Sequence, residues 1–157
     1  MLILQMKGGS QIIMNNIELR KKVHSAMYNL IKQNGIASPV EVLVEIGVLS
    51  KEDCEKWRFG KLDYLERACK INLSKLSTIN HEIRVFARKN DLKPSWTYYK
   101  RWGCKGKKIQ LRFSKSGEEQ IERLYATHYV SQRKPVNQRT DENAESNHED
   151  DVQSSPK

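Results

Sequence analysis

Between residues 17 and 89, apolar residues recur at helical spacing and polar capping residues separate the segments. The first segment begins after Asn15 or Asn16 and closes at Asn34-Gly35, a typical helix stop. A capping box, Ser38-Pro39-x-Glu41, places proline at the first helical position of the second. Three more helical segments begin at Ser50, at the pair Asp63 and Glu66, and at Asn72. The pattern therefore predicts helices over about 17–33, 40–46, 51–57, 63–70 and 72–89.

The character of the chain changes at Pro94, which cannot continue the preceding helix. The stretch 96–102 is aromatic and favours a β-strand, and the stretch 109–113 alternates apolar and polar residues as a half-buried strand does. Glycines in 103–107 are typical of a tight turn. We therefore expect a hairpin over about 96–113. A last helix should start at Ser116–Glu119 and carry Ile121, Leu124, Tyr125 and His128.

The predicted fold class is mostly α with one β-hairpin, that is α+β. Helices followed by a hairpin and a further helix are compatible with a helix-turn-helix or winged-helix arrangement. We expect one domain over residues 16–130. Residues 1–15 should form a flexible extension. Residues 131–157 have too little apolar content to offset their ordering entropy, which predicts an acidic disordered tail.

Charge is distributed unevenly along this basic chain. The 157 residues carry a net charge of +9, but the 32 residues of 84–115 contain eleven basic residues and one acid, a net charge of +10. The same window holds six of the twelve aromatic residues. Residues 141–157 have six acids against Lys157 alone, a net charge of −5. A concentrated basic and aromatic segment is typical of a surface that contacts an acidic polymer.

The predicted helix 72–89 has a polar stripe opposite its apolar one. Small hydroxyls near its start and arginines farther along suit a helix in the major groove, where arginine meets guanine edges or phosphates. The alternative is an ordinary solvated face. The stripe consists of Ser74, Ser77, His81, Arg84 and Arg88.

The first predicted strand interleaves aromatic residues with cations, a pattern that can stack bases and neutralise a backbone. Trp96, Tyr98 and Trp102 share one strand face, and Tyr99 and Arg101 share the other. We favour a core position for the tryptophans, beside Leu111 and its apolar neighbours Ile109 and Phe113. Tyr99 and Arg101 are then expected to be exposed.

Residues 38–70 show a short apolar segment ending at Gly47, a second segment led by Ser50, and Trp57-x-x-Gly60-Lys61. This arrangement resembles the repressor-type helix-turn-helix over about a fifth of the chain. The resemblance implies groove-facing positions at Lys51, Glu52, Glu55 and Lys56. However, the second segment has no net charge, which is unsuited to seeking phosphate. We therefore interpret the pair as a packing unit and Trp57 as a core residue.

Other classes of protein fit the sequence poorly. No apolar run approaches the ~20 residues of a membrane span, and no signal peptide is evident. Cys54, Cys69, His81 and Cys104 lack the close pairing of zinc ligands, so we expect no metal and no cofactor. Three widely spaced cysteines favour reduced thiols and a cytoplasmic protein. Tyr125, His128 and Tyr129 leave open an enzyme acting on nucleic acid, which we rank below a non-catalytic role.

The sequence thus predicts non-catalytic nucleic-acid binding, with DNA favoured over RNA. The alternative is a protein-interaction module whose basic face binds an acidic partner. The acidic tail is expected to compete for the basic surface. The candidate contact residues are Ser74, Ser77, His81, Arg84, Arg88, Lys89, Lys93, Tyr99, Lys100, Arg101, Lys105, Lys107, Lys108 and Arg112.

Overall fold

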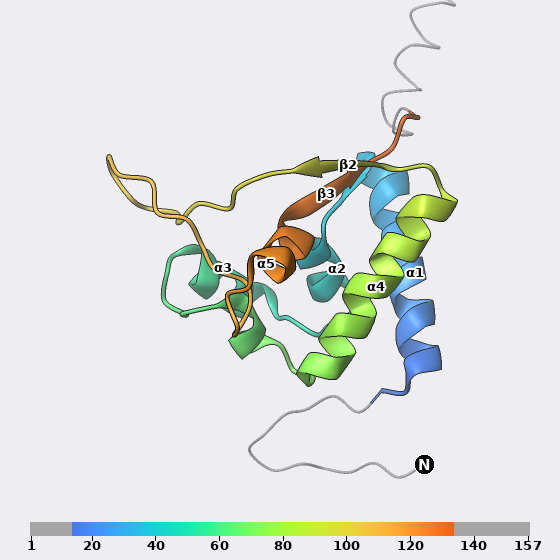
Figure 1. The fold of residues 1–157 in the computed structure, drawn as a ribbon, viewed down its shortest axis with the longest axis horizontal. Coiled ribbons are helices and arrows are strands. Elements are labelled where there is room, and N and C mark those ends of the chain that lie inside the picture. Colours follow the sequence, from blue (N-terminus) through green and yellow to red (C-terminus); the bar gives the residue numbers. More distant parts are fainter. Residues whose placement is uncertain (1–13, 134–157) are drawn as a thin grey trace, which may run out of the picture.

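A computed structural model describes residues 14–133 of the chain. The predicted extension and acidic tail fall almost wholly outside these residues. The described helices and strands, in order, are α1 (Asn16–Asn34), β1 (Ile36–Ala37), α2 (Pro39–Glu45), α3 (Lys51–Arg58), the 3₁₀ helix η1 (Leu65–Ala68), α4 (Leu73–Lys89), β2 (Lys93–Trp96), α5 (Glu119–Ala126) and β3 (Thr127–Val130). The α+β prediction is confirmed at this level, as Figure 1 shows.

Local capping chemistry sets the helix ends much as the sequence predicts. The side chains of Asn15, Ser38, Ser50 and Asn72 each accept a hydrogen bond from a backbone N–H in the first turn of their helix. These bonds satisfy donors that the helix itself leaves free. Gly35 ends α1 in the left-handed conformation, with φ of 73°. The predicted helix 63–70 is instead the short 3₁₀ helix η1.

The three strands form an antiparallel sheet in the order β1-β3-β2. The central strand of the sheet, β3, follows α5 directly. The sequence pattern placed these residues at the end of the last helix, and this prediction is wrong: His128 lies on a strand. Thr127 and Val130 belong to a β-branched segment that favours a strand once partners flank it on both sides. Pro94 is tolerated because β2 is an edge strand, whose outer side needs no hydrogen-bond donor.

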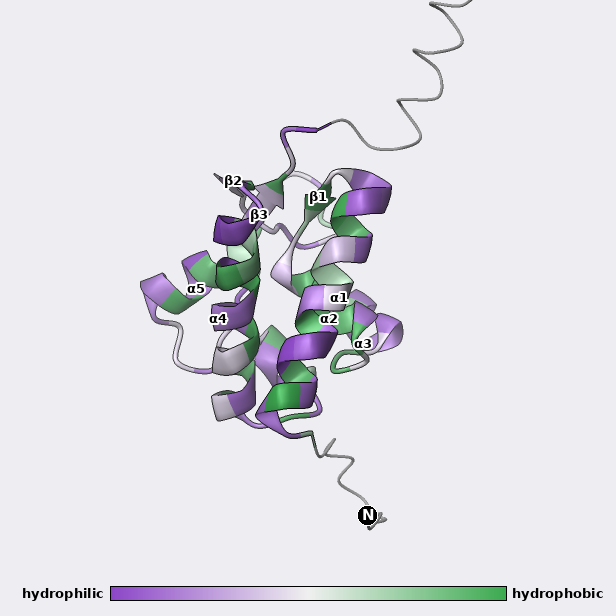
Figure 2. Cartoon of the chain, turned by 90° about the vertical axis from the view of Figure 1, so that its right-hand side faces the viewer, coloured by the Kyte–Doolittle hydropathy of each residue, from purple (hydrophilic) through white to green (hydrophobic). Residues whose placement is uncertain are grey.

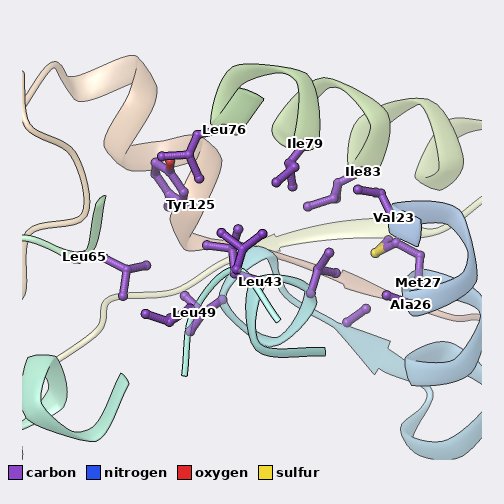
Figure 3. Packing of buried hydrophobic residues seen from close by; sticks show 14 of the residues in the cluster. Val23, Ala26, Met27, Leu43, Leu49, Leu65, Leu76, Ile79, Ile83 and Tyr125 are labelled. Carbon is purple, nitrogen blue, oxygen red and sulfur yellow. The ribbon is translucent and has the colours of Figure 1, made fainter. Parts of the chain in front are cut away.

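One hydrophobic core joins the helices and the sheet. Helices α1 and α4 pack side by side, and hydrophilic and hydrophobic residues alternate along both of them (Figure 2). Figure 3 shows Leu76, Ile79 and Ile83 of α4 directed toward Leu43 of α2, with Tyr125 of α5 beside them. Each fully buried aliphatic side chain stabilises the fold by about 1.5–3 kcal/mol. The spacing of Leu73 with Leu76 and Ile79 places it on the apolar stripe of the predicted helix 72–89, but it is the first residue of α4 and is 52% exposed.

Candidate nucleic-acid interface

Residues 97–112, here called the arm, project from the body between β2 and α5 (Figure 1). Its two sides run antiparallel: the N–H of Arg101 donates to the carbonyl of Ile109 at 2.7 Å, and that of Leu111 to Tyr99 at 2.8 Å. Only one bridge, Lys100 with Gln110, is regular enough to count as β pairing. The predicted hairpin is therefore present as a loosely paired arm. Its flanking strand β2 pairs elsewhere, with β3.

The aromatic faces of the arm are the reverse of those predicted. Trp96, Tyr98 and Trp102 are 46%, 52% and 44% exposed, whereas Tyr99 packs against the core. The cause is the register. With Lys100 opposite Gln110, Tyr99 lies opposite Leu111, and opposed residues of an antiparallel pair share a face. Because Leu111 is buried, Tyr99 faces inward and its neighbours face outward.

Ile109, predicted to be in the core, is 42% exposed because it lies farther out along the arm. The arm carries four exposed lysines: Lys105, Lys107 and Lys108 lie near its tip, and Lys100 lies nearer its root, opposite Gln110. None of these lysines forms an ion pair within residues 14–133. The arm therefore presents cations and aromatic rings together to solvent.

The root of the arm is fixed to the end of α3. The backbone N–H of Trp102 donates to the carbonyl of Arg58 at 2.7 Å, and Arg101 Nε donates to that of Phe59 at 3.1 Å. The Arg101 guanidinium lies where a β-carbon of Gly60 would be, and Gly60 itself has a φ of +75°. Arg101, predicted as a nucleic-acid contact, thus has a second role in attaching the arm.

A cavity of about 320 Å³ lies at this root, where α2, α3, the arm and β3 meet. The guanidinium carbon of Arg58 lies 4.9 Å from the centre of the Tyr99 ring and 4.5 Å from that of Trp102. Such placement over aromatic rings is a cation–π contact. The Tyr99 hydroxyl and His128 Nε2 are hydrogen-bonded at 2.8 Å. The lining residues are Ser38, Val40, Glu41, Cys54, Arg58, Thr97, Tyr98, Tyr99, Trp102 and His128.

Burial shifts the titration of the groups around this cavity. It lowers the pKa of Arg58, and the nearby Tyr99 and Cys54 raise it again in part. Burial also lowers the pKa of His128, against a smaller opposing effect of Glu41. The pKa values of Tyr99 and Cys54 are raised by burial. Each shift favours the neutral form, as expected where solvent is partly excluded.

Two carboxylates hold the other side of the arm where it re-enters the body. Glu122 accepts the N–H groups of Phe113 and Ser114 at 2.8 and 2.7 Å, and the Ser114 hydroxyl at 2.6 Å. Glu66 accepts the N–H of Lys115 at 2.8 Å and the Tyr125 hydroxyl at 2.6 Å. These N–H groups are occupied and are not available to a phosphate.

Arg112, predicted as a contact residue, belongs to the same anchoring set. Its Nε donates to the carbonyl of Ser114 at 2.8 Å, another of its nitrogens donates to Lys115, and its guanidinium lies over the Tyr64 ring. The sequence did not reveal this set. Glu66 lies about 50 residues from its backbone partner at Lys115, so no local pattern relates them.

The polar face of α4 is exposed as predicted, at Ser74, Ser77, His81, Arg84 and Arg88, and Lys89 and Lys93 continue it. It lies away from the arm, which is attached to α3 (Figure 1). Arg84 and Arg88 are close enough to lower the pKa of Tyr129, although burial raises that pKa overall. The structure therefore separates the predicted site into an α4 face and the arm.

Helices α2 and α3 cover most of the segment whose sequence resembles a helix-turn-helix, and Gly47, with φ of +82°, lies between them. Lys51, Glu52, Glu55 and Lys56 are exposed on α3, while Trp57 is fully buried, as expected for a core residue. The Trp57 indole N–H donates to the carbonyl of Arg112 at 2.8 Å. Helix α3 thus also supports the arm.

Comparison with known proteins found no matching family model, curated protein or solved structure. Within residues 14–133, no cluster of three or more His, Cys, Asp or Glu side chains could hold a metal ion. The helices in this part of the chain are also too short or too polar to cross a membrane.

Proposed function

We propose that this protein binds nucleic acid and that the arm is its main contact surface. One observation carries the proposal: four exposed lysines and three half-exposed aromatic rings lie on or beside the same projecting segment. Lysines neutralise phosphates, and aromatic rings stack on bases. The register of the arm turns Tyr98 and Trp102 toward solvent.

The exposed rings favour single-stranded nucleic acid over duplex. Bases in a duplex are stacked on one another, so an aromatic side chain reaches their faces only when a strand is unpaired or distorted. DNA remains the favoured polymer from the sequence, and RNA is the alternative to be compared. On this proposal Arg84 and Arg88 of the α4 face give a separate, weaker contact with phosphates.

Fluorescence anisotropy with labelled strands tests the proposal. A single-stranded DNA, an RNA of the same sequence and a duplex DNA are titrated with the full chain at about 50 mM salt, where basic contacts are strong. We expect submicromolar binding of a single strand and weaker binding of the duplex. If none of the three binds below micromolar concentration, the proposal is wrong and the acidic-protein alternative is favoured.

A further inference from the structure

We infer that the cavity at the root of the arm holds one unpaired nucleobase, an inference that rests on the proposed binding of nucleic acid. The cavity, here called the base pocket, has a volume of about 320 Å³. That volume lies at the small end of the range for ligand pockets, about 300–1,000 Å³. It suits a single nucleoside better than a larger ligand.

The rim of the base pocket offers stacking surfaces. Tyr98 and Trp102 both line it and are about half exposed. Trp102 is held in place by an edge contact with Phe59, at 5.5 Å between ring centres, and by Arg58. A ring that is fixed before binding loses little entropy when a base stacks on it.

The interior offers both a donor and an acceptor of hydrogen bonds. Arg58 and Glu41 line the same cavity, yet within residues 14–133 neither forms an ion pair. Arg58 Nε is buried and has no hydrogen-bond partner among the described residues, which carries a free-energy cost. Glu41 accepts a bond from the Ser38 hydroxyl at 2.9 Å through one oxygen. Base edges carry donors and acceptors side by side, so such a ligand can pair with both the guanidinium and the carboxylate.

Charge selects a base over other occupants. A phosphate or an acidic peptide side chain would meet Arg58 but would be repelled by the carboxylate of Glu41. A base is uncharged, and the strand that carries it has phosphates for the lysines farther along the arm. The position of Lys100, Lys105, Lys107 and Lys108 on the same segment therefore agrees with a base at its root.

The test compares two single-stranded oligomers of equal length, one with normal bases and one with abasic sugars, so that only the bases differ. One base stacked in a site strengthens binding about five- to 150-fold. We expect the full chain to bind the base-containing strand at least tenfold more tightly than the abasic strand. Both strands are measured at the same salt concentration.

Two matched substitutions assign that preference to the base pocket. Glu41→Gln removes the carboxylate but preserves the capping box, which accepts glutamine equally. Glu45→Gln removes the same charge one turn farther along α2, outside this cavity. We expect Glu45→Gln to tighten binding of both oligomers slightly, because an acid is lost. Glu41→Gln should weaken binding of the base-containing strand three- to tenfold and should tighten binding of the abasic strand only as slightly as Glu45→Gln does.

A second pair of variants keeps the test valid should Glu41→Gln fold poorly. Trp102→Leu removes a wall of the base pocket, and Tyr28→Leu removes a similarly exposed ring on α1 that does not line it. We expect the base preference to collapse to less than threefold in Trp102→Leu and to persist in Tyr28→Leu.

Each result bears on one proposal. If neither oligomer binds, the proposed function fails. If the wild-type protein binds both oligomers equally, or if each pocket variant keeps the preference of its control, nucleic-acid binding stands and the base pocket is overturned.

Discussion

Charge reversal at the tip of the arm gives the sharpest prediction. Lys107 and Lys108 are adjacent, exposed and free of ion pairs within the described residues. On single strands each phosphate neutralised contributes about −0.7 to the slope of log affinity against log salt. With four arm lysines engaged, the slope is about −2.8, and affinity falls roughly 50-fold between about 50 and 200 mM salt.

Replacing Lys107 and Lys108 with glutamate removes two of the four contacts. The slope should fall to about −1.4, so that the same salt increase costs only about sevenfold. Affinity at about 50 mM salt should drop at least about tenfold, because two attractive charges become repulsive. Anisotropy titrations at four salt concentrations measure both quantities.

The control for this experiment is the double variant Lys21→Glu and Lys22→Glu. Both lysines are exposed on α1, which lies across the molecule from the arm (Figure 1). Net charge changes by the same amount, so long-range attraction weakens equally, but the slope should stay near that of the wild type. If the two double variants have the same slope and affinity, binding follows net charge and the reasoning about the arm is refuted.

Three further predictions concern the arm root, pH and the acidic segment. Gly47→Ala should lower the free energy of unfolding by about 1–2 kcal/mol, because its backbone is left-handed. Gly60→Ala should lower it further, because the Arg101 side chain must also move to make room for the new β-carbon. Burial lowers the pKa of His128 below its ordinary 6.5, so the unfolded chain takes up a proton first. Stability should therefore fall as pH decreases below about 6.5, and His128→Gln should flatten this dependence. Removing the residues after Thr140, with their charge of −5, should tighten non-specific duplex binding at low salt.

Each of these has a clear opposing result. If urea unfolding shows that Gly60→Ala and Gly47→Ala lower the free energy of unfolding equally, then moving Arg101 costs no free energy. A His128→Gln variant as sensitive to pH as the wild type between pH 7.5 and 5.5 would assign the effect to another group. Unchanged duplex affinity after truncation would remove the idea that the acidic segment competes for the basic surface.

The helices were accessible from the sequence because their signals are local. Asn15, Ser38, Ser50 and Asn72 cap their helices through contacts within three residues along the chain, and the apolar stripes repeat within a few turns. The strands were harder to predict from the sequence. β3 forms only because β1 and β2 flank it, and these partners lie about 90 and 30 residues away in the chain.

The sequence by itself determined where the basic and aromatic residues lie, where the capped helices α1 to α4 begin, and that the chain is α+β. The tertiary structure decided which way the arm faces, because a one-residue choice of register exchanges buried and exposed side chains. Burial of Leu111 opposite Tyr99 made that choice and turned Trp102 outward. The anchoring carboxylates Glu66 and Glu122 and the cavity around Arg58 likewise depend on contacts between distant segments. Their energies come from burial and hydrogen bonding that exist only once the chain has folded.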